Sequence, residues 1–241
     1  MVAVAGIVAL ERSRCTFFGK EAAADRPGPA CMGAQHCPAL RGWEVMTENK
    51  NLPAMDSSGP LEELDADIAD ALVPFAERGA VRALGAVSDL SDQEPLYAAA
   101  AATLITAVML RDGRTWRAGT RILASHLLAT ALRGIVKKTV DRTRPEAAAE
   151  RGEYVLRGGE RHESDFNSFP SGHTAGAVAV ARAIGRDYAG AQGTALGIAG
   201  LAGAAQIVRS KHFLSDVVAG AAIGFIAEAL VDRLLRRAAT L

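Results

Sequence analysis

The chain has 241 residues, which is enough for one domain with a hydrophobic core, and its length gives no reason to expect two. It carries 27 Lys and Arg residues against 27 Asp and Glu residues, so its formal net charge is zero and does not suggest a nucleic-acid partner. The three cysteines, Cys15, Cys31 and Cys37, are odd in number and lack metal-ligand spacing, so they predict neither a disulfide framework nor a zinc site.

The first part of the chain, residues 1–58, is polar and contains several prolines. Its opening stretch, Met1–Leu10, is apolar but short and has no basic residue before it, so it does not resemble a signal peptide. Because Met46 and Met55 would also serve as starts, we expect residues 1–58 to be a disordered or misannotated extension.

From Pro60 to Val87, apolar residues recur at helical spacing with acidic residues between them, which predicts an amphipathic helix that packs on a bundle or lies at a membrane surface. Downstream come four Ala- and Gly-rich apolar runs of 15 to 18 residues, whose ionisable exceptions are His126, Arg133 and Glu228. The runs are Leu96–Leu110, Ile122–Val136, Ala191–Val208 and Val217–Val231. Their length is at or just under that of a transmembrane helix, so we interpret them as membrane helices; buried helices of a soluble bundle are the alternative.

Five helices are predicted after the amphipathic one, so the fold class is all-α, a multi-helix transmembrane bundle. Their ranges are about Pro95–Leu110, Trp116–Lys138, Gly172–Gly185, Gln192–Val208 and Ser215–Arg233. If each helix crosses the membrane once, the polar motifs described below fall on one side and a set of arginines falls on the other: Arg111, Arg114, Arg117, Arg186, Arg233, Arg236 and Arg237. By the positive-inside tendency, the arginine side faces the cytoplasm.

Glycines recur every three or four residues in the last two helices, at Gly193, Gly197, Gly200, Gly203, Gly220 and Gly224. Small residues at this spacing let helices approach closely in lipid, so we predict that these glycines lie at helix contacts. A direct role in substrate binding is the alternative.

A basic cluster, Lys137-x6-Arg144-Pro145, follows the second apolar run. Arginine presents a planar fork that binds two phosphate oxygens at once, and lysine presents a compact point charge. The cluster therefore suits a phosphate group, although anchoring of a helix end at lipid headgroups is the better explanation when these residues are considered alone.

The stretch Pro170-Ser171-Gly172-His173 precedes an apolar helix. Glycine allows close approach to the backbone, the Ser171 hydroxyl can donate, and the first N–H groups of the helix are unsatisfied and attract an anion. His173 can then protonate a leaving oxygen. As a single histidine at a helix start, it would otherwise be a cap or a surface residue.

His212 and Asp216 are four residues apart and share a face if the segment is helical. A carboxylate that accepts from one imidazole nitrogen fixes the tautomer and leaves the other nitrogen free to attack. A structural His–Asp pair is the alternative. Together with the two clusters above, the pair makes a site for a tetrahedral oxyanion and suggests phosphate-ester chemistry.

In this order the three clusters resemble the motifs of the type 2 phosphatidic acid phosphatase (PAP2) superfamily, K-x6-R-P, P-S-G-H and S-R-x5-H-x3-D, over residues 60–236. The resemblance implies the helical fold shared with haloperoxidases and a membrane phosphatase that needs no metal or other cofactor. It also implies that His212 is the nucleophile and forms a phosphohistidine, that Asp216 orients it, and that His173 protonates the leaving group. The phosphate ligands that it implies are Lys137, Arg144, Ser171 and the Gly172 backbone N–H.

The third motif departs from this pattern, because Ala205 and Gln206 stand where Ser-Arg is expected. Gln206 can donate a hydrogen bond to phosphate, but without the charge assistance that makes such contacts worth about 1.5–3 kcal/mol. Arg209, about one helical turn later, is a candidate for reaching the same oxygens. We therefore include both side chains among the expected phosphate-binding residues.

The first functional interpretation is hydrolysis of a lipid phosphate monoester or diphosphate of the undecaprenyl diphosphate, phosphatidic acid or phosphatidylglycerophosphate type. The second, motivated by Gln206, is a catalytically weak or inactive membrane protein that binds phosphorylated lipid. The third is a vanadium-dependent haloperoxidase or a soluble acid phosphatase, whose soluble members should lack the four apolar runs. The expected partners are the lipid substrate and the bilayer, and no nucleic acid is expected. The sequence does not predict the oligomeric state. The expected location is the bacterial inner (plasma) membrane, with the active site on the extracytoplasmic face.

Overall fold

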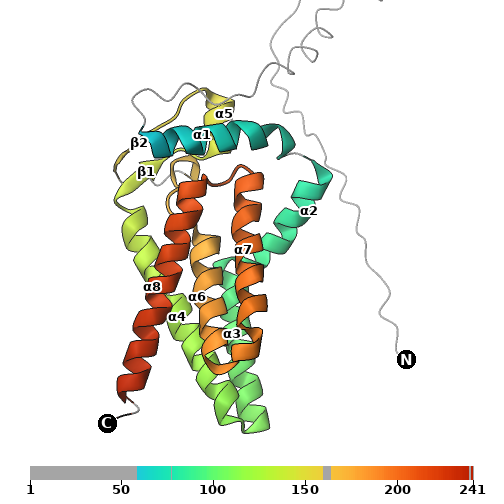
Figure 1. Ribbon diagram of the computed structural model, residues 1–241, viewed down its shortest axis with the longest axis vertical. Coiled ribbons are helices and arrows are strands. Elements are labelled where there is room, and N and C mark those ends of the chain that lie inside the picture. The colour runs from blue at the N-terminus through green and yellow to red at the C-terminus, as the bar shows by residue number, and fades with distance from the viewer. Residues whose placement is uncertain (1–58, 77, 160–163, 239, 241) are drawn as a thin grey trace, which may run out of the picture. The chain divides into compact units, whose positions relative to one another are not determined.

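The computed structural model describes residues 59–76, 78–159, 164–238 and 240. The expected N-terminal extension, residues 1–58, lies outside the described residues. The described part contains eight α-helices and two short β-strands (Figure 1). The helices are α1 (Pro60–Leu72), α2 (Gly79–Ser88), α3 (Gln93–Leu110), α4 (Gly113–Lys137), α5 (Pro145–Arg151), α6 (Gly172–Asp187), α7 (Gln192–Val208) and α8 (Leu214–Ala238). This confirms the predicted all-α bundle and its five long helices.

Short 3-10 turns and one antiparallel pair of strands lie between the helices. The turns are η2 (Val73–Phe75), η3 (Asp89–Ser91), η4 (Ser164–Phe166) and η5 (Ala189–Ala191). Strands β1 (Val140–Arg142) and β2 (Leu156–Gly158) pair antiparallel, with Asp141 opposite Arg157. Strands β1 and β2 and helix α5 all lie between α4 and α6.

The centre of the bundle is α6, which packs against α4, α7 and α8. Its buried residues are mostly alanines, and Ala179 and Ala183 are fully buried. The contact with α8 is close enough to require glycine: a Cβ at Gly220 or Gly224 would lie 2.4 Å from a backbone carbonyl oxygen of α6 or of the residue before it. The small side chains therefore hold the start of α8 against the start of α6.

The glycines of α7 behave differently from the prediction. A Cβ at Gly193, Gly197 or Gly200 would meet no atom of the described chain within 4 Å, and all three residues are exposed. Of the four glycines predicted to pack, Gly203 does so, against Val217 and Thr174. The prediction was wrong for the other three because the buried side of α7 is formed by alanines, while these glycines face outward.

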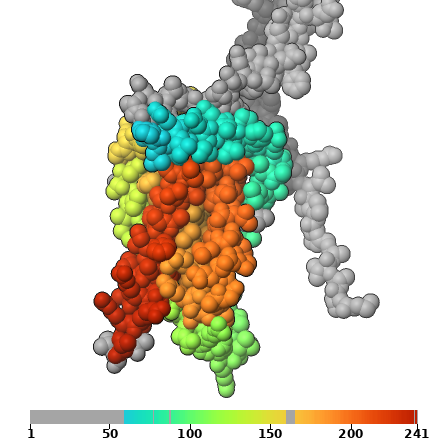
Figure 2. Space-filling model, viewed as in Figure 1, coloured from blue at the N-terminus to red at the C-terminus, as the bar shows by residue number. Residues whose placement is uncertain are grey.

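The amphipathic segment from Pro60 to Val87 is two helices rather than the single predicted one. The break falls at η2, which contains Pro74. Proline has no N–H group and its ring clashes with the preceding turn, so one continuous helix cannot pass through it. Helix α1 lies across the ends of α7 and α8, and α2 packs along α7 (Figures 1 and 2).

By length and composition, two helical segments of the described chain could cross a membrane, Ala189–Val208 and Leu214–Ala238. The sequence had suggested four, but α4 is interrupted by several basic residues and falls below this criterion, as does α3. Large apolar side chains nevertheless point outward from α3, α7 and α8, among them Met109, Leu201 and Phe225. Such outward-facing side chains suit contact with lipid.

Candidate active site

The three motifs meet at one end of the bundle, which we call the motif end. It is formed by the last turn of α4 with Lys137, by Arg144 before α5, by the start of α6, and by the turn before α8 with His212 (Figure 1). This confirms the predicted placement of the motifs on one side. The backbone N–H of Ser171 donates to the carbonyl oxygen of Asp216 at 3.0 Å, which joins the second and third motifs directly.

The start of α6 is built to receive an anion. Ser171 is its fully buried N-cap, and the Ser171 hydroxyl lies 3.0 Å from the Thr174 hydroxyl and 3.5 Å from the Thr174 N–H. The N–H groups of Gly172 and His173 stand in the first turn, where the helix itself offers no acceptor. The helix dipole adds a partial positive charge there, so this end favours a phosphate group.

His212 precedes α8 and is not part of it, so the expected shared helix face is replaced by a turn. Its Nδ1 lies 3.7 Å from Oδ2 of Asp216, which is longer than a hydrogen bond, and this nitrogen is buried without a hydrogen-bond partner among the described residues. Burial lowers the pKa of His212, and the nearby Asp216 carboxylate opposes this effect without overcoming it. The imidazole is therefore neutral near pH 7, the form that can act as a nucleophile.

Asp216 is fully buried and held by several donors. Its Oδ2 accepts from the Ser168 hydroxyl and, at 2.9 Å, from the Phe213 N–H. The second bond caps α8, because Asp216 is the third residue of the helix and Phe213 precedes it. Helix capping thus fixes the carboxylate beside His212.

Arg142, which the sequence did not single out, is the other partner of Asp216. It is 3% exposed, and its Nη1 donates at 2.6 Å both to Asp216 Oδ1 and to the Ser215 hydroxyl. Its Nη2 donates to Asp65 of α1 at 2.7 Å, and its guanidinium lies 4.1 Å from the centre of the Phe213 ring. Although burial alone would lower it, the surrounding negative groups, Asp216 first, raise the pKa of Arg142 above its usual value. Arg142 therefore keeps Asp216 ionised and ties α1 to the site.

A second unexpected residue is Arg133, one helical turn before Lys137 on α4. Residues at this spacing share a helix face, so Arg133 and Lys137 point to the same side. The guanidinium of Arg133 packs on Gly172: a Cβ there would lie 2.7 Å from the guanidinium carbon. In the sequence, the spacing to Lys137 is the available signal, but Arg133 lies inside an apolar run, which obscures it.

Arg144 is the N-cap of α5, and its N–H donates to the carbonyl oxygen of Asp165 at 2.8 Å. Burial lowers the pKa of its guanidinium, while Glu146, Asp165 and Asp216 act in the opposite direction. The positive charge of Arg144 in turn helps to lower the pKa of His212. This effect of Arg144 on the pKa of His212 agrees with a position near the nucleophile expected from the sequence.

His173 and Arg209 share one carboxylate at the edge of the site. Nε2 of His173 lies 3.9 Å from Oδ1 of Asp89, and Nη1 of Arg209 donates to the same oxygen at 2.7 Å. Arg209 also donates to the Gly85 carbonyl at 3.4 Å. Arg209 is thus close to His173 but engaged with α2 and η3.

Gln206 is 2% exposed, and its side chain connects α7 to α2. Its Nε2 donates to the Ser88 hydroxyl at 2.8 Å, and Ser88 donates to the Ala202 carbonyl at 3.2 Å. Of the expected phosphate ligands, the structure therefore brings together Lys137, Arg144, Ser171 and Gly172 at the start of α6, whereas Gln206 and Arg209 are bonded to α2 and η3.

Positive groups dominate this site. The cationic side chains of α4 and the α5 N-cap, the N–H groups of α6 and two histidines face the same region, an arrangement that suits an anion with a nucleophile and a proton donor beside it. No group of three or more His, Cys, Asp or Glu side chains in the described ranges is placed to hold a metal ion.

Comparison with known proteins agrees with this geometry. A sequence model of the PAP2 superfamily matches residues 118–238, half of the chain. No curated protein matches the chain in sequence. Among solved structures, the transmembrane PAP2 type phosphatidylglycerolphosphate phosphatase from Bacillus subtilis is similar with a TM-score of 0.58 and 22% identity, over 75% of this chain and 88% of that one. LpxE from Aquifex aeolicus is similar with a TM-score of 0.52 and 20% identity, over 74% of this chain and 98% of that one.

The chain shares the fold of these neighbours, and two of its described helical segments are long and apolar enough to cross a membrane. The match to the superfamily covers α6, α8 and most of α4, and so includes all three motifs. By this match the chain belongs to the PAP2 superfamily, and its enzyme class is that of a PAP2-type phosphatase.

Proposed function

We propose that the protein hydrolyses a lipid phosphate monoester or diphosphate through a phosphohistidine at His212, and that residues 60–236 form the catalytic domain. The observation that carries this proposal is the meeting of a neutral, buried histidine with the cationic start of α6. Two proteins of similar fold, a phosphatidylglycerolphosphate phosphatase and LpxE, support it by analogy.

In the first step, Nε2 of His212 attacks phosphorus, because Nδ1 faces Asp216. The N–P bond forms as the bond to the lipid oxygen breaks, and His173 gives that oxygen its proton, releasing the lipid product. In the second step, water attacks the phosphohistidine, gives its proton to His173 and releases inorganic phosphate. Asp216 stabilises the positive imidazole ring between the steps.

The phosphoryl oxygens would be held by Lys137, Arg144, Ser171 and the Gly172 N–H, which surround the start of α6. These groups are positive or act as donors before substrate arrives, so they require little rearrangement when charge develops in the transition state. Gln206 and Arg209 remain weaker candidates, since both would have to leave partners on α2 or η3.

An apolar groove supports a lipid substrate. It has a volume of about 340 Å³ and is lined by α2, η3, α3, α6 and α7, including Leu90, Val180 and Ile198. One end reaches Ser88 and Ser91, which flank the Asp89 that faces His173. A hydrocarbon chain in this groove would place its phosphate at the motif end.

The proposed location is a bacterial inner membrane, with the motif end on the extracytoplasmic face. The arginines at the opposite end support this orientation by the positive-inside tendency. Gly158 lies in β2 at the motif end, so a Gly158→Cys variant without the native cysteines reports the orientation. We expect an impermeant thiol reagent added from outside the inner membrane to label this cysteine. Labelling only from the cytoplasmic side would show that the orientation is the opposite of the proposed one.

The activity is tested with detergent-purified protein, a chelator, and a panel of phosphatidic acid, phosphatidylglycerophosphate and undecaprenyl diphosphate. We expect phosphate release that survives the chelator and disappears in His212→Ala. A second function, phosphorylated-lipid binding without turnover, is favoured by the engagement of Gln206 with Ser88. Folded protein that binds these lipids but releases no phosphate would establish it instead.

A further inference from the structure

We propose that Arg133 binds the phosphoryl group of the substrate and supplies the guanidinium that the third motif lacks. The proposal rests on the phosphatase function proposed above and adds a ligand to the same site. Three observations carry it: the position of Arg133 on Gly172, its lack of a partner within the described ranges, and the hydrogen bonds that already engage Gln206 and Arg209.

The guanidinium of Arg133 lies where a phosphate at the start of α6 would be bound. The position of a Cβ at Gly172 is 2.7 Å from the guanidinium carbon and from Nε of Arg133, and 3.1 Å from its Nη2. The absence of a side chain at residue 172 thus gives the guanidinium its place beside the first N–H groups of α6. An oxyanion there can accept from both the backbone and the arginine fork.

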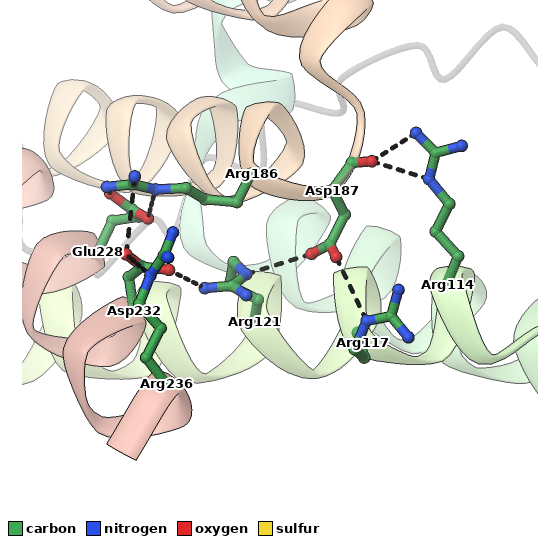
Figure 3. Close-up of polar contacts among 8 residues, drawn as sticks. All are labelled: Arg114, Arg117, Arg121, Arg186, Asp187, Glu228, Asp232 and Arg236. Carbon is green, nitrogen blue, oxygen red and sulfur yellow. Dashed lines mark hydrogen bonds and ion pairs between the residues drawn. The ribbon is translucent and has the colours of Figure 1, made fainter. Parts of the chain in front are cut away.

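Arg133 has no protein partner in the part of the chain that the structure describes. It makes no hydrogen bond or ion pair with a described residue, and its Nε is buried without an acceptor. The charges that act on it over longer distances are those of Asp92 and Arg144. By contrast, Arg121 and Arg186 are paired with carboxylates at the other end of the bundle (Figure 3). A half-buried cation without an acceptor is unfavourable, and a bound phosphate relieves this.

The residues at the motif position cannot easily take this role. Gln206 is buried against Ser88, and Arg209 is bound to Asp89. With Arg133, the site contains two guanidinium groups, Arg133 and Arg144, and the Lys137 ammonium, which together suit a phosphate dianion. Arg133 therefore reaches the phosphoryl group from α4, where the motif arginine would have reached it from α7.

The test compares Arg133→Ala and Arg133→Lys with Arg117→Ala, a control on the same helix whose side chain is 65% exposed and lies at the opposite end. The readouts are kcat/KM on phosphatidic acid in detergent, the affinity for orthovanadate as a phosphate analogue, and the midpoint of thermal unfolding. We expect Arg133→Ala to lower kcat/KM and vanadate affinity about tenfold to a hundredfold, the range of a charge-assisted hydrogen bond. Arg133→Lys should lose less, and Arg117→Ala should match the wild type.

The unfolding midpoint separates ligand binding from a structural role. Because Arg133 has no partner among the described residues, its removal should leave the midpoint of the anion-free protein unchanged or raise it, and should reduce the rise that vanadate produces. A lower midpoint with unchanged vanadate affinity would overturn the proposal, as would vanadate affinity and turnover equal to those of Arg117→Ala.

The two proposals fail in different ways. If the wild type binds vanadate but hydrolyses none of the lipids, the phosphatase function fails, and the vanadate affinity of Arg133→Ala still tests this inference. If the wild type is active and Arg133→Ala is equally active, this inference fails and the function stands. A wild type that neither binds vanadate nor releases phosphate overturns both.

Discussion

Arginines at the two ends of α4 and α6 have different surroundings. Away from the motifs, at what we call the arginine end, a network connects α4, α6 and α8 through Asp187, Glu228 and Asp232 (Figure 3). Arg121 donates to Asp232 at 2.6 Å and to Asp187 at 3.2 Å. Glu228, which is fully buried, accepts from Arg182 at 2.9 Å and from Arg186 at 2.7 Å.

At the motif end, Arg133 and Lys137 have no carboxylate within ion-pair distance in the described parts of the chain. The carboxylate nearest to the reaction, Asp216, is already bound to Arg142. The same helices thus end in paired charges on one side and in an excess of positive charge on the other. The paired end holds the helices together, whereas the positive end is arranged for a negative ligand.

The largest expected effect comes from His212→Ala. Removing the proposed nucleophile should reduce kcat by more than about a thousandfold, as the loss of a catalytic nucleophile does in other enzymes. Since Nδ1 of His212 has no hydrogen-bond partner among the described residues, the unfolding midpoint should not fall by more than a few degrees. Phosphate release and thermal unfolding measure the two quantities, and residual turnover close to that of the wild type would exclude His212 as nucleophile.

At the arginine end the effect should fall on stability instead. Glu228→Gln leaves Arg182 and Arg186 without their buried carboxylate, so we expect the free energy of unfolding to fall by about 3–5 kcal/mol, the loss typical of a broken buried pair. Denaturant unfolding in detergent measures this. The kcat of the remaining folded protein should stay near that of the wild type. A large loss of kcat without a loss of stability would contradict the assignment of stability to the arginine end and activity to the motif end.

Gly172→Ala sharpens the comparison at the motif end. The new methyl group would displace the Arg133 guanidinium, so kcat/KM should fall about tenfold, equivalent to about 1.4 kcal/mol. In an Arg133→Ala background the methyl group has nothing to displace, and the same change should have little further effect. A double-mutant cycle of kcat/KM measures this coupling, and strictly additive losses would show that the two residues act independently.

The smallest effect is on pH dependence. Because burial lowers the pKa of His212 from its ordinary value of 6.5, the acid limb of the kcat/KM profile should have its midpoint below pH 6.5. The unfolded chain, whose histidine has the ordinary pKa, then binds more protons than the folded protein, so stability should decrease as pH falls below 6.5. Activity and unfolding profiles between about pH 4 and 8 measure both, and an acid limb above pH 6.5 would contradict the burial of a neutral imidazole.

Much of this arrangement could be predicted from local sequence. Apolar runs placed the five long helices to within a few residues, and their alternation placed Lys137, Ser171 and His212 at one end. The site residues that the sequence missed depend on long-range contacts: Asp65 lies 77 positions from Arg142 and 150 from Ser215. The 3.6-residue periodicity of a helix is a local pattern, so it cannot predict contacts between residues this far apart in the chain.

Other predictions were wrong where two faces of one helix have similar sequence patterns and only packing determines which face is buried. The glycines of α7 have the spacing of a contact face, but alanines on its other side form the contact. Arg133 was hidden by its apolar neighbours, since hydropathy averages over a whole run and does not report which face a charged residue occupies.

The link from Asp65 through Arg142 to Asp216 sets a limit on how far the chain can be shortened. The superfamily match begins at residue 118, but a protein cut there would lose α1 and leave Arg142 without one of its two carboxylates. A truncation after residue 58 keeps this connection, whereas one after residue 72 removes it. We therefore expect the smallest active piece to begin with α1.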